Sequence, residues 1–152
     1  MKIERILFPT DFSTGSFHAL PYAADFARTY KAKLYIFHVV FDVTQATSSH
    51  VPHISADELH REMNEWAKKE MDTCCIEHVR GLADVEKVVV KGIPYDEILK
   101  FAADNKIDMI VMGTYGRKGF EKFIFGSTVD KVVRKAPCPV LTVRVPEHRE
   151  KK

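Results

Sequence analysis

The chain has 152 residues, of which 45% are hydrophobic and 29% are charged, a composition that suits one domain with a substantial core. Its formal net charge of +2 does not suggest the concentrated basic face of a nucleic-acid-binding protein, so we expect no nucleic-acid partner. We see no apolar run long enough for a membrane span or a signal peptide, and the three cysteines do not form a disulfide framework. We therefore expect a cytoplasmic protein with no membrane partner.

The first half of the chain alternates short apolar runs with longer segments of helical periodicity. We predict strands over residues 3–8 and 33–40, helices over residues 16–31 and 56–78, and an irregular segment over residues 41–55. Ser13 or Thr14 is placed to cap the first helix, in which Pro21 marks either a kink or the true first turn. An apolar stripe that predicts a core-facing side of the long helix comprises Leu59, Met63, Trp66, Met71 and Cys74.

The second half continues the alternation of strand and helix. We predict strands over residues 84–91, 108–112 and 140–145, and helices over residues 95–105 and 127–135. Pro94 suits the first turn of the helix that follows it. Strands that alternate with helices indicate an α/β domain with a mostly parallel, doubly wound sheet. The residues 33–40 are almost continuously apolar, as expected for a strand that is covered on both faces.

A glycine-rich loop follows the fourth predicted strand. Met112, Gly113, Thr114, Tyr115 and Gly116 begin it, and Gly126, Ser127 and Thr128 lead into the next helix. Backbone N–H groups in such a loop can close on an anion, and the helix N-terminus adds partial positive charge. The loop has neither a Walker lysine motif nor a dinucleotide fingerprint. We interpret it as a phosphate-binding loop, the alternative being a tight structural turn.

Three segments are expected to meet at one end of the sheet. Ligands of parallel α/β sheets bind at the carboxyl ends of the strands, where the strand order reverses. This rule brings together residues 9–11, residues 38–40 and the glycine-rich loop. Asp11 is a candidate nucleotide contact. The alternatives are a local role as a helix cap or an Asx turn, and a role as a phospho-acceptor. Arg117 follows the second glycine of the loop and is the basic residue that we favour for a phosphate contact.

Several other polar side chains have less specific interpretations. The spacing of His50, His53 and His60 resembles a metal set, but solvated loop histidines or a lid over a nucleotide explain it better. We expect Cys74 and Cys75 to be inert, partly buried thiols. We expect His38, at the end of a strand, to be packed or hydrogen-bonded.

These motifs together resemble the universal stress protein family over essentially the whole chain. The nucleotide-binding subgroup of that family has the spacing Gly-x2-Gly-x9-Gly-Ser/Thr, which is met here by Gly113, Gly116, Gly126 and Ser127. The segments ILFPTDFS, HVV, VKGIPYDEIL, DMIVMGTYGR and PCPVLTVRV resemble further landmarks of the family. One departure is Tyr115, where many relatives have histidine.

The resemblance implies a flavodoxin-like, Rossmann-like single domain whose five-stranded sheet has the order 3-2-1-4-5. It implies a nucleotide-binding domain over residues 1–146, followed by a charged tail over residues 147–152. ATP is the implied ligand, with ADP or AMP as variants and Mg²⁺ alongside. The implied contacts are Pro9, Thr10, Asp11, the backbone of Val39, Met112, Gly113, Thr114, Gly116, Arg117, Gly126, Ser127 and Thr128.

The resemblance also implies stress adaptation, and often a homodimer. The edge of the last strand, Val140 to Val145, would be exposed in a monomer, so pairing with a second copy is a natural solution. Our leading interpretation is an ATP-binding regulatory protein that presents a different surface to a protein partner. One alternative is a slow ATPase or another nucleotidyl-handling enzyme, although we see no evident general base. The other is a dimeric module that binds no nucleotide.

Overall fold

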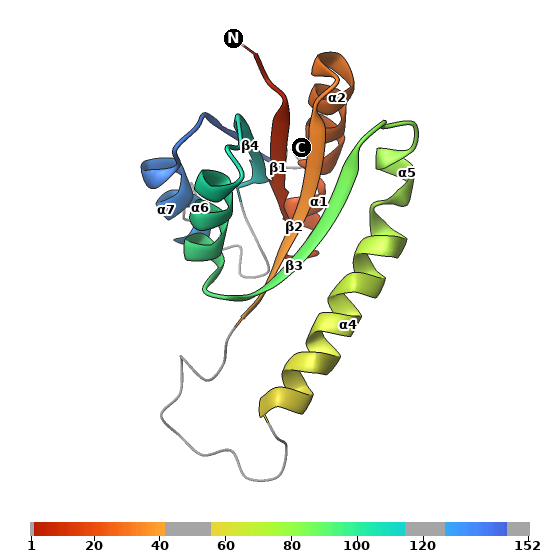
Figure 1. Cartoon of the computed structure of the whole chain (residues 1–152), viewed down its shortest axis with the longest axis vertical. Coiled ribbons are helices and arrows are strands. Elements are labelled where there is room, and N and C mark those ends of the chain that lie inside the picture. The colour runs from red at the N-terminus through yellow and green to blue at the C-terminus, as the bar shows by residue number, and fades with distance from the viewer. Residues whose placement is uncertain (1, 42–55, 115–126, 146–152) are drawn as a thin grey trace, which may run out of the picture.

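A five-stranded parallel sheet lies between two layers of helices in the computed structural model, which describes residues 2–41, 56–114 and 127–145 (Figure 1). In chain order the elements are β1 (Arg5–Pro9), α1 (Thr14–Phe17), α2 (Leu20–Tyr30), β2 (Lys33–Phe41), α4 (Ala56–Cys74), α5 (Ile76–Val79), β3 (Val85–Gly92), α6 (Pro94–Asp104), β4 (Met109–Gly113), α7 (Ser127–Lys135) and β5 (Val140–Val143). No helix within these residues combines the length and apolarity that crossing a membrane requires.

The strand order is β3-β2-β1-β4-β5, and all four neighbouring pairs are parallel. The predicted doubly wound fold and the order 3-2-1-4-5 are therefore confirmed. The chain moves outward from β1 to β3 on one side and then returns to place β4 on the other side of β1. This reversal leaves a topological switch point between the carboxyl ends of β1 and β4.

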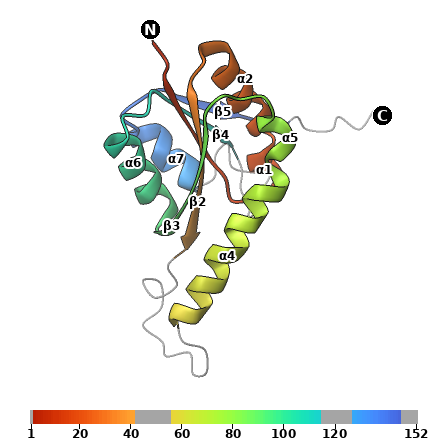
Figure 2. The same ribbon diagram turned by 45° about the vertical axis from the view of Figure 1, so that its right-hand side comes forward.

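Alternate residues of the strands point to two separate cores. Ile6, Phe8, Leu34 and Ile36 pack on one face with buried residues of α2 and α4 and with the partly buried Val79 of α5. Buried residues on the other face pack with α6 and α7 and include Leu7, Tyr35, Phe37 and Ile110. Figure 2 shows α4 and α5 on the opposite side of the sheet from α6 and α7. Both faces are covered, which explains why β2 is almost continuously apolar.

Two of the predicted helices are interrupted. The helix predicted over residues 16–31 is split into α1 and α2, and Pro21 lies in the first turn of α2. Its interpretation as a true first turn is therefore confirmed, since the N–H that proline lacks would have no intrahelical partner in the first turn. The helix predicted over residues 56–78 ends at Cys74 and is followed by the short α5. Pro94 occupies the first turn of α6, as predicted.

The predicted apolar stripe of α4 was partly wrong. Trp66 is 46% exposed, whereas the fully buried positions of the helix include Ala67 and Met71. Leu59 and Met63 are half-buried. The helix therefore turns a small alanine, and not the large indole, toward the sheet, which lets its backbone approach β2 and β3 closely.

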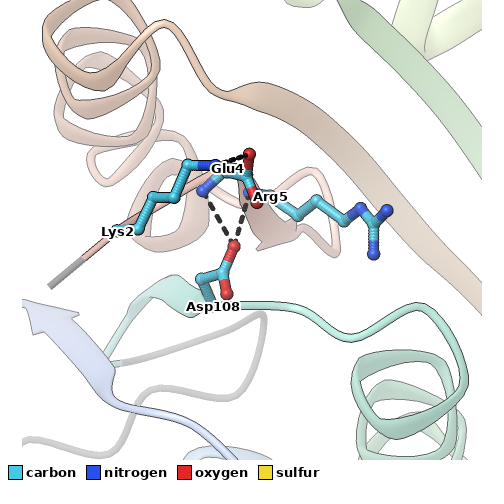
Figure 3. Close-up of polar contacts among 4 residues, drawn as sticks. All are labelled: Lys2, Glu4, Arg5 and Asp108. Atoms are coloured by element: carbon cyan, nitrogen blue, oxygen red, sulfur yellow. Dashed lines mark hydrogen bonds and ion pairs between the residues drawn. The ribbon is translucent and has the colours of Figure 1, made fainter.

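The amino ends of β1 and β4 are joined by one side chain. Asp108 Oδ2 accepts hydrogen bonds from the backbone N–H groups of Glu4 at 2.8 Å and Arg5 at 2.9 Å (Figure 3). The Asp108 N–H in turn donates to the Arg5 carbonyl at 2.9 Å. Lys2 forms an exposed ion pair with Glu4 beside this contact. These bonds align the two central strands at the end of the sheet that lies away from the switch point.

Candidate functional site

The turn between β1 and α1 is held by a chain of hydrogen bonds among its own polar side chains. The Phe12 N–H donates to Thr10 Oγ1 at 3.0 Å, and Thr10 Oγ1 lies 2.9 Å from Ser16 Oγ. Ser16 Oγ donates to the Ser13 carbonyl at 3.0 Å, so the Thr10 hydroxyl must be the donor to Ser16. Ser13 is the N-cap of α1 and accepts from the Ser16 N–H, which confirms one of the two predicted caps. The turn is thus pre-formed by its own residues.

Asp11 takes part in the same turn. Its Oδ1 accepts from the Ser13 N–H at 3.0 Å and from the Ser13 hydroxyl at 2.5 Å, which is an Asx turn. The prediction that Asp11 forms a local Asx turn is therefore confirmed for its Oδ1 atom. A nucleotide contact by Asp11 stays a prediction.

His38 links β2 to this turn. Its Nδ1 lies 2.8 Å from the Thr10 carbonyl oxygen, and the side chain is only 8% exposed. A carbonyl oxygen only accepts, so Nδ1 carries the proton and donates it. The Thr10 N–H donates to the Phe37 carbonyl at 2.8 Å, so both polar groups of the Thr10 backbone are bound to β2. The prediction that His38 is packed or hydrogen-bonded is confirmed on both counts.

An aromatic cluster covers the His38 ring on the α4 side of the sheet. The Phe12 ring centroid lies 4.4 Å from that of His38 and 5.3 Å from that of Trp66, with an edge-on contact in the second pair. Phe12 has a φ of 62°, in the left-handed region that non-glycine residues rarely adopt. The turn therefore uses an unfavourable backbone conformation to direct this ring between the histidine and the tryptophan.

The end of β4 packs directly against the start of α1. A Cβ atom added to Gly113 would collide with the backbone carbonyl of Gly15 and touch the Cα of Ser16. Thr114 follows, and its N–H donates to the Val143 carbonyl at 3.0 Å. The Thr114 side chain is 4% exposed, and its Oγ1 has no hydrogen-bond partner among the residues that the structure describes. A buried hydroxyl without such a partner is costly, which marks this atom as a candidate ligand contact.

The structure brings together part of the predicted site. The turn over residues 9–13, the end of β2 and the end of β4 meet at the carboxyl edge of the sheet. Met112 is buried in β4 and Val39 is half-buried in β2. Ser127 and Thr128 begin α7, which packs on the sheet through Val129 and Val132. The predictions for Tyr115, Gly116, Arg117, Gly126, His50 and His53 fall on residues outside those that the structure describes, as do those for the tail and for residues 42–55 of the irregular segment. Phe41, the first residue of that predicted segment, is instead the last residue of β2.

The predictions for the histidines and for the cysteines fall partly on residues that the structure describes. His60 lies in α4 and is 9% exposed, so its description as a solvated loop histidine was wrong. Within the described part of the chain, no three His, Cys, Asp or Glu residues gather as a metal site would require. Cys75 is fully buried in the core, and the free thiol of Cys138 is half-buried. Burial raises the pKa of the Cys138 thiol, and Asp108 adds to this effect.

Sequence reasoning missed three contributors to the site. It did not single out Gly15, whose close contact with Gly113 depends on the tertiary fold. It also missed the left-handed Phe12, because the segment has no glycine or asparagine at that position to signal a positive φ. The Ser16 hydroxyl, which completes the turn, gave no signal beyond its distance of three residues from Ser13.

The sheet order and the polar turn at its switch point define a flavodoxin-like α/β protein with a candidate ligand site at the carboxyl edge. Residues 2–144 match the universal stress protein family, and the chain belongs to that family. Universal stress protein MJ0531 of Methanocaldococcus jannaschii is 33% identical over 149 residues, which cover 95% of this chain and 84% of that protein. Universal stress protein YxiE of Bacillus subtilis is 30% identical over 146 residues, covering 93% and 99% of the two chains.

Solved structures share the fold. Universal stress protein UspA from Lactobacillus plantarum is 28% identical, with a TM-score of 0.82, and the match covers 95% of this chain and 99% of that one. A universal stress protein in complex with cAMP is 23% identical with a TM-score of 0.64, over 96% and 100% of the two chains. An Arabidopsis thaliana family protein with AMP bound is 19% identical with a TM-score of 0.62, over 98% and 97%. At these lower identities, the last two support the fold alone.

Proposed function

We propose that this protein binds an adenine nucleotide, with ATP as the ligand, and acts as a nucleotide-dependent regulatory module in stress adaptation. One observation carries the proposal: the β1–α1 turn, the end of β2 and the end of β4 meet where the strand order reverses. Ligands of open α/β sheets bind at such switch points. Because this chain belongs to the universal stress protein family, the cAMP and AMP bound to other members of the family lead us to propose an adenine nucleotide as the ligand class.

The proposed contacts follow the edge of the sheet. They are Pro9, Thr10, Asp11, Val39, Met112, Gly113, Thr114, Gly116, Arg117, Gly126, Ser127 and Thr128. The buried Thr114 hydroxyl fits a polar group of the ligand, because it has no partner among the described residues. The N-terminus of α7 begins at Ser127 and would add partial positive charge next to a phosphate. In this proposal Thr10 shapes the site and does not bind the ligand through its hydroxyl, which is bonded to Ser16.

The proposal includes Mg²⁺ as a partner of the nucleotide. The described residues offer no cluster of carboxylates for this ion, and Asp11 Oδ1 is already bonded to Ser13. Mg²⁺ keeps several waters and is commonly held through substrate phosphates. We therefore propose that the phosphate oxygens of ATP, and not a protein cage, supply its main ligands.

Isothermal titration of the purified protein with ATP, ADP, AMP, cAMP and GTP tests the proposal. Binding of an adenine nucleotide, with weaker or no binding of GTP, is the expected result. An absence of binding heat at several temperatures, with no change in the fluorescence of the single tryptophan Trp66, would refute nucleotide binding. The Trp66 signal is informative because its ring contacts Phe12 in the β1–α1 turn.

The Thr114→Val variant is a matched test of the site. Valine has nearly the same shape but lacks the hydroxyl, so the fold should keep its stability while a hydrogen bond to the ligand is lost. We expect affinity for the preferred adenine nucleotide to fall about tenfold, which corresponds to about 1.4 kcal/mol. An unchanged affinity would remove Thr114 from the list of contacts.

The regulatory part of the proposal concerns assembly and turnover. β5 is an edge strand that pairs only with β4 among the described strands, and a second copy pairing along Val140 to Val145 would cover it. We propose a cytoplasmic homodimer whose surface toward a protein partner depends on the bound nucleotide. Sedimentation with and without ATP tests the dimer. Phosphate release above that of a Gly126→Val variant would indicate the alternative, a slow ATPase.

A further inference from the structure

We propose that His38 is a positioning residue that withdraws the Thr10 carbonyl from the β1–β2 ladder and thereby keeps the Val39 N–H available to a ligand. Pro9 is in register with Phe37, and the Thr10 N–H donates to the Phe37 carbonyl at 2.8 Å, one step beyond the end of β1. In a parallel ladder, the next bond would run from the Val39 N–H to the Thr10 carbonyl.

The hydrogen bond observed at that carbonyl comes from a side chain instead. His38 Nδ1 donates to the Thr10 carbonyl oxygen at 2.8 Å. The His38 ring lies on the α4 side of the sheet, where it contacts Phe12 and Trp66. The bond therefore draws the carbonyl toward that side and away from the in-plane direction in which a strand donor would approach. Among the backbone hydrogen bonds of the described residues, none joins the Val39 N–H to Thr10.

The direction of the Val39 N–H follows from the alternation of β2. Residues two apart on a strand point their polar backbone groups toward the same neighbour. Phe37 directs its carbonyl to Thr10, so Val39 also directs its N–H toward the β1 side of the sheet. Beyond Thr10 the chain leaves that side and enters the turn to α1. The donor thus faces the switch point, where an adenine ring nitrogen would be a suitable acceptor.

The His38 ring is held tightly enough to perform this role. It is buried, and the ring of Phe12 lies against it with a centroid separation of 4.4 Å. Phe12 reaches this position only through its left-handed backbone conformation. The unfavourable turn and the histidine therefore act together. Nδ1–H is present in this neutral tautomer and in the protonated ring, so the bond to Thr10 does not require a particular charge state.

This inference rests on the proposed function only for the identity of the ligand. Its structural part concerns one amide, whose hydrogen exchange can be measured in the ligand-free protein. If His38 keeps Val39 out of the ladder, the Val39 amide should exchange at least tenfold faster than the Phe37 amide, which lies further inside the strand. Equal protection of the two amides in the wild-type protein would overturn the inference, whatever nucleotide the protein binds.

Two variants test the link to binding. His38→Phe keeps a ring of similar shape but cannot donate, and His38→Asn keeps an N–H donor close to the position of Nδ1. In His38→Phe we expect the Val39 amide to become protected, adenine nucleotide affinity to fall about tenfold, and the preference for ATP over GTP to shrink. His38→Asn should restore all three properties. If the wild-type protein binds nucleotide and His38→Phe binds it equally well with the same preference, the inference is wrong. If the wild type binds none, the proposed function fails, and the exchange comparison still decides the role of His38.

Discussion

Gly113 lies so close to Gly15 that no side chain fits between the end of β4 and the start of α1. We predict that Gly113→Ala lowers the free energy of unfolding by about 3 kcal/mol, because the new methyl group meets backbone atoms that cannot rotate away. Urea denaturation followed through Trp66 fluorescence measures this change. The variant is therefore a poor probe of phosphate binding, since any lost affinity would accompany a damaged fold.

Gly81→Ala is the matched control for this prediction. Gly81 has a φ of 80° but open space around the position of a Cβ atom. Its substitution should cost only about 1 kcal/mol, from the backbone conformation alone. If Gly113→Ala is no less stable than Gly81→Ala, the contact with Gly15 does not constrain the fold.

The turn at Phe12 gives a prediction in which two effects oppose one another. Phe12→Ala removes the ring from between His38 and Trp66 but keeps the left-handed φ, so we expect a loss of about 2–3 kcal/mol. Phe12→Gly removes the same ring but relieves the backbone, and it should be about 1 kcal/mol more stable than Phe12→Ala. Parallel thermal and urea unfolding of the two variants measures the difference. Equal stabilities would show that the positive φ carries little cost.

The sequence allowed the architecture and part of the site to be predicted, because apolar runs and their spacing report which surfaces are buried. The same reasoning failed for Trp66, since hydrophobicity alone cannot tell that α4 needs a small side chain where it approaches the sheet. Ala67, one position further along the helix and about 100° around its axis from Trp66, meets that need.

The contacts across the switch point were beyond sequence reasoning for a different reason. The bond from His38 to the Thr10 carbonyl and the approach of Gly113 to Gly15 join residues far apart in the chain. Such pairs follow from strand register and helix placement, which local periodicity does not report. The Ser13 cap was predictable because its partners lie within one helical turn.

Asp108 provides a test of the end of the sheet opposite the site. Asp108→Ala removes the acceptor for the N–H groups of Glu4 and Arg5, and we expect the free energy of unfolding to fall by about 1–2 kcal/mol. Asp108→Asn keeps one oxygen acceptor and should lose less. Nucleotide affinity should be unchanged in both, because the contact lies at the amino ends of β1 and β4. A stability equal to that of the wild type in Asp108→Ala would mean that water replaces the carboxylate without cost.

The raised pKa of the Cys138 thiol should make the stability of the protein depend on pH in the alkaline range. Burial, with a smaller contribution from Asp108, raises the pKa of this thiol in the folded protein above its ordinary value. The folded and unfolded states both keep the thiol protonated at lower pH, so no effect is expected there. Above about pH 8.5 the unfolded thiol loses its proton more readily than the folded one, and the free energy of unfolding should decline.

Urea titrations of the wild type and Cys138→Ala between pH 7 and 10 isolate this thiol, because the remaining groups titrate in both proteins. The decline should be steeper in the wild type. Parallel curves, or alkylation of Cys138 by iodoacetamide as fast in the folded protein as in urea, would contradict a raised pKa.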